Sequence, residues 1–486
     1  MGFIKFNHSA TRINKLVLLS LFSCLSMPAF AESIWYKDGD PLNTQIDSLP
    51  RIPAGYIEPN APCANADLSK PITLAEVADT SLCNNPLTSE IWANTRIQAA
   101  QLGIAKSAYL PSLTDNVSGG LNVSNPESSS RSNPNVNLSN SLVASYLLYD
   151  FGNRNANLEN ARQLLLSASA SQSSVVQNVL LTATVAYYQV QANIAALDAA
   201  REAERASEES FKAADARYKA GVATPADKLQ AQTAYAQLTL LRITREGDLQ
   251  NAYGNLSNVM GLPANRKIAL ATSVNYTPAN ILEDVNSLIE QAGTRRPDLV
   301  ASEAQVKAAQ ANIDASKAAA KPTISVSMFN NQQDGSQLSS SNSSTLGLTL
   351  SIPLFSGYAP SYRIRAAEAT ADLRAAQRDR LRLQISLDVW TAYQSLRTAI
   401  ESVTASEALL NSAEQSYRVA LGRYKAGVGN IIDTLNAQSA LASARQLKIQ
   451  AVLNSNIARA TLAQAMGALD NAMIQSLPTS SSLSSN

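Results

Sequence analysis

Few side chains in this chain could carry out chemistry. It contains one histidine, His8, which lies in an N-terminal segment that we expect to be removed. A mature chain without histidine cannot perform Ser-His-Asp, Cys-His or histidine-ligated zinc chemistry. The acidic residues are scattered along Ala-rich helical sequence and do not gather at strand ends. We therefore predict that the protein is not an enzyme and that it uses no metal and no cofactor.

The first 31 residues have the pattern of a secretory signal peptide. Basic residues precede an apolar run over 16–30, which ends in the small-x-small sequence Ala29-Phe30-Ala31. We predict cleavage after Ala31. An uncleaved membrane anchor would need a longer uninterrupted apolar run. A lipid attached at Cys24 is also disfavoured, because the bulky Phe22 precedes Ser23 and Cys24.

Export determines how the remaining cysteines and charges are interpreted. Cys63 and Cys83 are an isolated pair in an oxidising periplasm, which predicts one disulfide that closes a short loop near the N-terminus. A metal site would need more ligands than these two. Removal of three of the 39 basic residues leaves 36 basic against 38 acidic residues, a net charge of −2. This balance, without a clustered basic face, indicates no nucleic-acid partner.

The sequence contains a long internal repeat. The run Arg217-Tyr218-Lys219-Ala220-Gly221-Val222 recurs 206 residues later as Arg423-Tyr424-Lys425-Ala426-Gly427-Val428, and the same offset places Asp227 on Asp433. We predict a first repeat over 71–261, an inter-repeat segment over 262–294 and a second repeat over 295–467. An extended segment over 32–70 precedes them, and 468–486 is a C-terminal segment with a disordered tail from Pro478.

Both repeats have the same predicted order of elements. A lead-in helix is followed by a β-hairpin, a long helix, a turn and a return helix. The predicted bounds are about Thr73–Ala108, 113–149, Asn153–Lys219, 219–225 and Pro225–Met260 in the first repeat, and about Pro297–Ala319, 323–355, Ser361–Lys425, 425–431 and Ile431–Met466 in the second. One helix over Asn153–Lys219 would be about 100 Å long, which suits a coiled-coil-like tube better than a compact domain.

The strand segments alternate with period 2 between apolar and small polar residues, as in Leu346, Leu348 and Leu350 against Gly347 and Thr349. In an exported protein this pattern predicts an outer-membrane β-barrel; the edge of a soluble β-sandwich is the alternative. Four strands cannot close a barrel, so several subunits must combine, and three would supply twelve strands. The predicted fold is mixed α and transmembrane β: a homotrimeric 12-stranded barrel with four strands per subunit, continued by a long periplasmic α-helical coiled-coil barrel.

Several motifs resemble the TolC family of outer-membrane efflux and secretion proteins. They are Leu74-Ala75-Glu76-Val77, Tyr109-Leu110-Pro111-Ser112-Leu113, Arg296-Pro297-Asp298-Leu299, Ile352-Pro353-Leu354-Phe355-Ser356-Gly357 and the duplicated Arg-Tyr-Lys-Ala-Gly turns. The resemblance covers nearly all of the mature chain. It implies a homotrimeric, passive exit duct in the outer membrane, in contact with its lipid, with a periplasmic adaptor (membrane fusion) protein and an inner-membrane ABC or proton-driven pump as partners.

The resemblance also implies roles for residues at the two turns. It places a periplasmic gate or constriction at Asp227, Tyr424, Asp433 and Asn436, with Asp227 near Tyr424 and Asp433 in a three-fold ring. It places the tip turns and the adaptor docking site at Gly221, Val222, Gly427 and Val428. Asn436 stands near a second acidic ring of the family, and Gly429 stands where some members have a basic residue, so we expect a weaker negative constriction.

Other interpretations of these features remain open. Asp227 and Asp433 each fall three residues after a predicted N-cap, Thr224 or Asn430, where helix capping alone would explain a carboxylate. The cargo is either small molecules, as in drug efflux, or polypeptides, as in type I secretion. From a different class, the chain could be a trimeric surface adhesin or a structural coiled-coil spacer.

Overall fold

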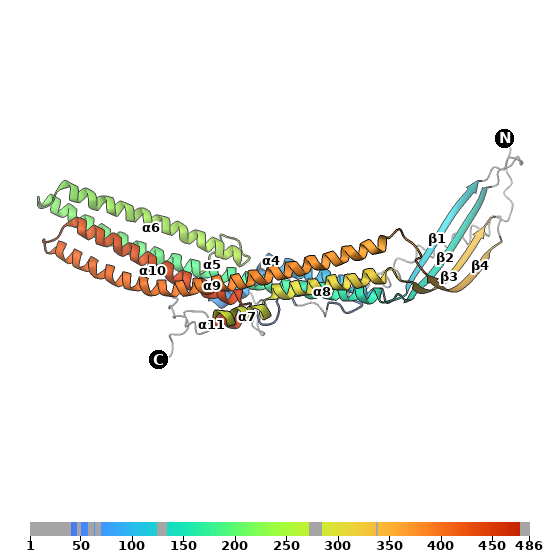
Figure 1. Ribbon diagram of the computed structural model, residues 1–486. Helices are drawn as coiled ribbons and strands as arrows, with labels where there is room; N and C mark the ends of the chain where they lie inside the picture. The colour runs from blue at the N-terminus through green and yellow to red at the C-terminus, as the bar shows by residue number, and fades with distance from the viewer. Residues whose placement is uncertain are drawn as a thin grey trace, which may run out of the picture.

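A computed structural model describes residues 40–45, 50–56, 63, 70–123, 134–271, 284–336 and 339–476. The predicted signal peptide with its cleavage site, the first hairpin loop and the tail from Pro478 lie outside the described residues. The molecule is long, with a β-sheet at one end and two helical hairpins at the other (Figure 1). The elements are α3 Leu74–Asn84, α4 Pro86–Ser107, β1 Ser112–Val123, β2 Pro134–Tyr149, α5 Asn153–Lys219, α6 Pro225–Val259, α7 Val285–Arg295, α8 Pro297–Ala318, β3 Thr323–Gly335, β4 Ser341–Ser351, α9 Ala359–Lys425, α10 Ile431–Ala465 and α11 Asn471–Ser476.

The two halves of the chain contain helices of equal length in the same order. α3 and α7 have 11 residues each, α4 and α8 have 22, α5 and α9 have 67, and α6 and α10 have 35. A β-hairpin lies between the second and third helix of each half. The predicted long helices and return helices agree with these bounds to within two residues.

The lead-in helix of the first half differs from the prediction, because it is two helices. Asn85 is extended (φ −65°, ψ 128°), and it ends α3 and caps α4 through a hydrogen bond from Leu87 N to its side chain. A residue before proline is disfavoured in the α region, so Pro86 imposes this break. Arg296 before Pro297 separates α7 from α8 in the same way, and α7 occupies the last ten residues of the predicted inter-repeat segment 262–294.

The four strands form one antiparallel sheet in the order β1-β2-β3-β4. The second half's hairpin differs from its predicted bounds of about 323–355, because β4 ends at Ser351. Pro353 follows within two residues and has no N–H to donate to a neighbouring strand. β1 and β4 each pair on one side only within the subunit.

The helices lie side by side in two overlapping layers of four. Next to the sheet, α4 packs on α5, α5 on α8 and α8 on α9; towards the hairpins, α6 packs on α5, α5 on α10 and α10 on α9. One lateral side of the subunit therefore consists of β1, α4 and α6, and the other of β4 and α9. The main core lies where these layers meet and includes the buried rings of Tyr187 and Tyr188.

The N-terminal segment runs along this helical layer without forming a helix or strand in its described parts. Gln172 Nε2 donates to Pro50 O (2.7 Å), and Arg51 Nη2 donates to Cys83 O (2.7 Å). The structure joins Cys63 and Cys83 in a disulfide with a Cα–Cα distance of 5.4 Å, which confirms the predicted pairing. The segment is thus tied to the end of α3.

Candidate functional site

One face of the sheet is polar and uncharged. A row across the four strands consists of Ser112, Ser145, Ser327 and Gly347, and the hydroxyls of Ser112 and Ser145 lie 2.7 Å apart. The other residues of this face whose side chains the structure describes are Ser, Thr, Asn, Gln and Gly, apart from Val143, Leu147 and Phe329. Such a face can line a water-filled passage without attracting either sign of charge.

The opposite face is apolar in the part nearest the helices. Leu346, Leu348 and Leu350 of β4 are 58–75% exposed in the isolated subunit, and Ile352 and Leu354 continue the series. The stretch from Leu346 to Leu354 is about 26 Å of extended chain, or about 20 Å along a barrel axis at a tilt of about 40°. That height is close to the ~25 Å apolar band of outer-membrane barrels.

Polar residues and an aromatic collar mark the two ends of this apolar face. At the outer end, Asn330 and Ser344 make β3 and β4 polar in the cross-strand row that also holds Asp115 and Leu142, whereas β1 continues with the exposed apolar Val117 and Leu121. At the helical end, exposed aromatic rings gather where the strands meet α5 and α9. They form contacts between Tyr149 and Phe151 (4.8 Å between centroids) and between Phe355 and Tyr358 (5.5 Å).

Both helical hairpins turn through the same backbone motif. Gly221 (φ +76°) and Gly427 (φ +78°) adopt the left-handed conformation that glycine tolerates best. Val222 N donates to Arg217 O, and Val428 N donates to Arg423 O, both at 3.0 Å, as in a Schellman motif. Val222 and Val428 follow the glycines and are among the most exposed apolar residues, at 73% and 70%. The predicted tip residues therefore lie at two projecting apolar turns.

The structure places the predicted gate residues at these turns but does not join them. The Asp227 carboxylate accepts hydrogen bonds from Thr224 N (3.0 Å) and Thr224 Oγ1 (2.9 Å), which completes a capping box at the start of α6. No hydrogen bond between Asp227 and Tyr424 occurs within the described chain. Asp433 and Asn436 are exposed on the first turn and a half of α10.

Tyr424 has a different partner, which the sequence did not reveal. The Arg217 guanidinium carbon lies 4.3 Å from the centroid of the Tyr424 ring, and Arg217 Nη2 donates to Tyr424 O at 2.8 Å. Tyr424 is only 7% exposed. Arg217 was visible as part of a repeated motif, but a contact across 207 residues leaves no local signal. This contact joins the two hairpins of the subunit.

Charges near the turns are largely paired within the first hairpin. Lys219 and Lys228 lie 2.7 and 2.8 Å from the two carboxylate oxygens of Asp215. Hydrogen bonds from Lys219 and then Lys228 hold the pKa of Asp215 below its usual value, and the hydrogen bond to Asp215 raises the pKa of Lys228. Lys228 also approaches the ring of Tyr218 (5.4 Å).

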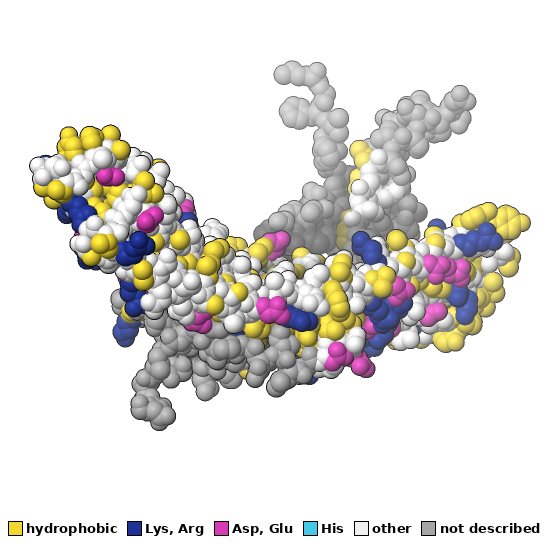
Figure 2. Space-filling view, turned by 60° about the vertical axis from the view of Figure 1, so that its left-hand side comes forward, with side chains coloured by type: hydrophobic (Ala, Val, Ile, Leu, Met, Phe, Trp, Pro, Cys, Tyr) yellow, Lys and Arg dark blue, Asp and Glu magenta, His cyan; other side chains and the backbone are white. Residues whose placement is uncertain are grey.

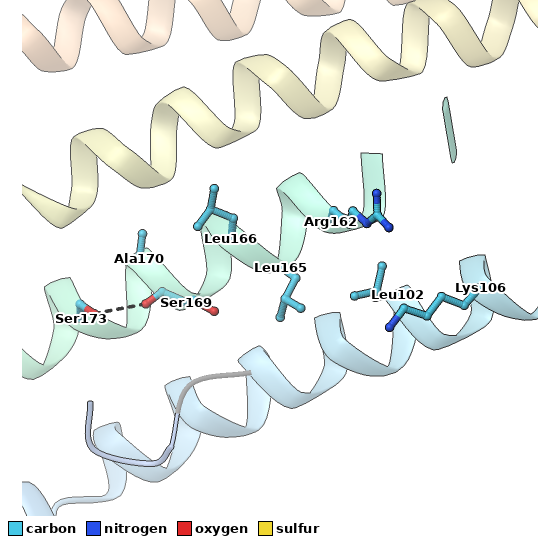
Figure 3. Close-up of a pocket in the computed structure, with 8 residues that line it drawn as sticks. All are labelled: Leu102, Lys106, Arg162, Leu165, Leu166, Ser169, Ala170 and Ser173. Carbon is cyan, nitrogen blue, oxygen red and sulfur yellow. Dashed lines mark hydrogen bonds between the residues drawn. The ribbon is translucent and has the colours of Figure 1, made fainter. Parts of the chain in front are cut away.

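A groove of about 620 Å³ lies between α4 and α5 (Figure 3). Leu102 and Lys106 of α4 face Leu165, Leu166 and Ser169 of α5 across it. Lys106 Nζ donates to Leu42 O (3.5 Å), so the N-terminal segment borders this groove. The side chains that line it include no group of catalytic or metal-binding residues.

On the face in Figure 2, basic and acidic side chains are interspersed and do not form one basic surface. In the described part of the chain, no three His, Cys, Asp or Glu residues are placed to hold a metal ion.

None of the helices described combines the length and apolarity needed to cross a bilayer.

Comparisons with known proteins agree with the class of protein that this architecture defines, an outer-membrane channel. The family model described as "Outer membrane efflux protein" matches residues 77–262 and 288–468. The chain belongs to this family, which confirms the resemblance to TolC proteins. Members work as outer-membrane channels of tripartite efflux and secretion systems with adaptor and pump partners, and they are not enzymes.

Individual relatives cover most of the chain. Protein CyaE of Bordetella pertussis is 30% identical over 418 residues, covering 85% of this chain and 88% of CyaE. The outer membrane efflux protein BepC of Brucella suis is 26% identical over 393 residues, covering 79% and 82%. The CmeC outer membrane channel of Campylobacter jejuni has the same fold, with a TM-score of 0.74, 16% identity and coverage of 82% and 86%. The protein is thus an outer-membrane channel for efflux or secretion.

Proposed function

We propose that three copies of this chain surround one axis and form a continuous duct, with a twelve-stranded barrel in the membrane and a helical tube in the periplasm. The observation that carries this proposal is the open sheet. β1 and β4 each leave one edge unpaired, and four strands are too few to close on themselves. The edge of β4 in one subunit can pair with the edge of β1 in the next.

The helices on the two lateral sides support the same closure. On α6, Leu229, Leu240 and Ile243, at spacings of 11 and 3 residues, lie on one side of the helix and are 52–65% exposed. They lie on the face of α6 opposite the buried Ala231. On α9, Leu383 and Leu409 are exposed, whereas the residues of its other face, such as Val389 and Leu396, are buried. A ring of subunits would cover both exposed stripes at once.

The equal helix lengths support an origin of the two halves as tandem repeats. Because each half contributes one hairpin at the narrow end, three subunits would place six similar hairpins around the exit path. We infer that the uncharged face of the sheet lines the lumen and that the apolar face and its aromatic collar contact outer-membrane lipid.

The two turns serve, in this proposal, as the periplasmic tip. The exposed Val222 and Val428 offer an apolar docking surface to a periplasmic adaptor, with Gly221 and Gly427 permitting the turns. Asp433 and Asn436 face the axis and form the constriction. Asp227 acts as a helix cap, and Tyr424 holds the two hairpins together through Arg217.

In this proposal the duct has no dedicated binding site and does not itself choose its cargo. The groove between α4 and α5 carries no set of groups that would select one compound. The relatives include the antibiotic efflux pump outer membrane protein ArpC of Pseudomonas putida as well as Protein CyaE, whose name states no drug. We propose passive exit of a cargo that the inner-membrane pump selects. Pump deletion with the duct intact would then abolish export of each cargo without altering conductance of the duct.

The trimer is tested by the mass of the purified protein in detergent, measured by light scattering with a detergent correction. Leu240→Glu should shift the trimer towards monomer, because it places a charge in the lateral contact. Val222→Glu is the matched control: Val222 is at least as exposed as Leu240 but lies at the turn, outside that contact. A wild-type monomer that still conducts in a planar bilayer would refute the proposed assembly.

A further inference from the structure

The two repeats place the same pair of residues, an arginine and a tyrosine, at the end of each long helix. Arg217-Tyr218 lie near the end of α5, and Arg423-Tyr424 lie near the end of α9. If each arginine contacted the tyrosine of the other repeat, two contacts would form: Arg217 with Tyr424, and Arg423 with Tyr218. Only one of them, Arg217 with Tyr424, exists within a single chain.

The residues of the second possible contact, Arg423 and Tyr218, are exposed. Arg423 lies on the surface, and within the described part of the chain its guanidinium has no hydrogen bond or ion pair. Tyr218 is 39% exposed, whereas the equivalent Tyr424 is 7% exposed because Arg217 covers its ring. Residues that are equivalent by repeat thus have unequal surroundings: Arg217 covers the ring of Tyr424 at 4.3 Å, whereas Tyr218 has only Lys228 near its ring, at 5.4 Å, and no arginine.

The backbone around both pairs is the same. Gly221 N donates to Tyr218 O at 3.0 Å, and Gly427 N donates to Tyr424 O at 3.1 Å. Both carbonyls lie at a helix C-terminus, where the helix dipole favours an approaching cation. Tyr218 O can therefore accept an arginine N–H in the way that Tyr424 O accepts that of Arg217.

The order of the helices around the narrow end indicates which tyrosine lies next to Arg423. Around the narrow end the subunit runs α6-α5-α10-α9, so Arg217 reaches from its own hairpin to the next hairpin in this order. The hairpin that follows α9 in a closed ring is α5–α6 of the adjacent subunit. One repeat step therefore brings Arg423 to that subunit's Tyr218.

We propose that Arg423 of each subunit stacks on Tyr218 of the adjacent subunit and donates to its carbonyl oxygen. This inference rests on the proposed trimer. Three contacts within subunits and three between them would join six hairpins in an alternating ring. The subunits would then be linked at their tips through an arginine–tyrosine contact as well as through the barrel edges.

Thiol crosslinking of the mature full-length protein tests this contact. The only cysteines of the mature chain, Cys63 and Cys83, are paired, so they do not react. A short bismaleimide is first chosen that crosslinks Arg217→Cys/Tyr424→Cys within one chain. The same reagent should then convert Arg423→Cys/Tyr218→Cys into covalent dimers and trimers on a denaturing gel.

Lys425→Cys/Tyr218→Cys is the matched control, because Lys425 lies two residues further along α9 on another side of the helix. We expect at least a fivefold higher yield of dimers and trimers for the Arg423 pair. Equal yields for both pairs, in protein that light scattering shows to be trimeric and in which the Arg217 pair reacts, would overturn the inference. A monomer in light scattering would instead contradict the proposed assembly.

Discussion

Four glycines at the ends of the hairpin helices allow a graded test of what the backbone requires. Gly221, Gly427, Gly261 and Gly467 have φ between +70° and +78° and occupy the same position of a Schellman motif. They differ in their surroundings. A Cβ at Gly221 or Gly427 would meet nothing within 4 Å, whereas a Cβ at Gly261 would lie 2.5 Å from Asn84 O.

The expected costs follow from this difference. An L-residue in the left-handed region costs about 1–2 kcal/mol, and Gly→Ala should show this cost alone at Gly221 and Gly427. Gly261→Ala adds an overlap with backbone that must move, typically about 1–3 kcal/mol more. Gly467→Ala should fall between them, because its Cβ would lie 3.0 Å from Arg295 O.

The measurement is guanidinium unfolding of each purified variant in detergent, followed by helical circular dichroism. Asparagine variants separate the two contributions, because asparagine tolerates the left-handed conformation better than alanine. Gly221→Asn should unfold close to wild type, and Gly261→Asn should remain strongly destabilised. Equal midpoints for Gly221→Ala and Gly261→Ala would refute the argument that the contact with Asn84 controls the second site.

Three further predictions concern the disulfide and the charges. Cys83→Ser should lower unfolding stability by about 3 kcal/mol, the chain-entropy value for a loop of this size, and reductant should shift the melting of wild type equally but not that of the variant. Asp433→Asn should reduce cation preference, measured as the reversal potential in a KCl gradient, while Asp115→Asn on the outer face of the sheet should not. Since the pKa of Asp215 is lowered on folding, its stabilising contribution is present above the ordinary aspartate pKa and is lost as the pH falls through the folded value. The melting difference between wild type and Asp215→Asn should therefore persist at pH 4 and disappear only in stronger acid; its loss between pH 7 and 5 would contradict the assigned contacts.

Most of the fold could be predicted because its determinants are local. The helix Asn153–Lys219 has no glycine or proline inside it, and Gly152 and Gly221 lie at its two ends, so its bounds could be predicted to the residue. The strands followed from a period of two. The break at Asn85 has a local cause as well, because proline restricts the residue before it, and the predicted helix Thr73–Ala108 is wrong at this point.

The tip contacts could not be predicted because they join residues far apart in the chain. The resemblance suggested that Asp227 and Tyr424 interact. In the structure the Asp227 carboxylate instead accepts hydrogen bonds from the backbone N–H and the hydroxyl of Thr224, three residues earlier in the chain. A local capping partner is always within reach of an N3 carboxylate, so it competes effectively with a distant hydroxyl. Tyr424 is contacted by Arg217 instead, and this contact becomes visible only in the three-dimensional structure.

The same glycines indicate where the duct can change its width. At the far ends of the return helices, Gly261 touches Asn84 and Asn85 Nδ2 donates to Val259 O (3.0 Å), and these contacts fix α6 to the start of α4. At the tips, a Cβ at Gly221 or Gly427 would meet nothing within 4 Å, and among the described residues Arg217 and Tyr424 connect the two turns. Since the face inferred to line the barrel carries no charge, we expect the proposed ring of Asp433 near the tips to contribute to any selection by charge. Gating and ion selectivity are therefore expected at the same end of the molecule, and a substitution that releases Arg217 should alter both.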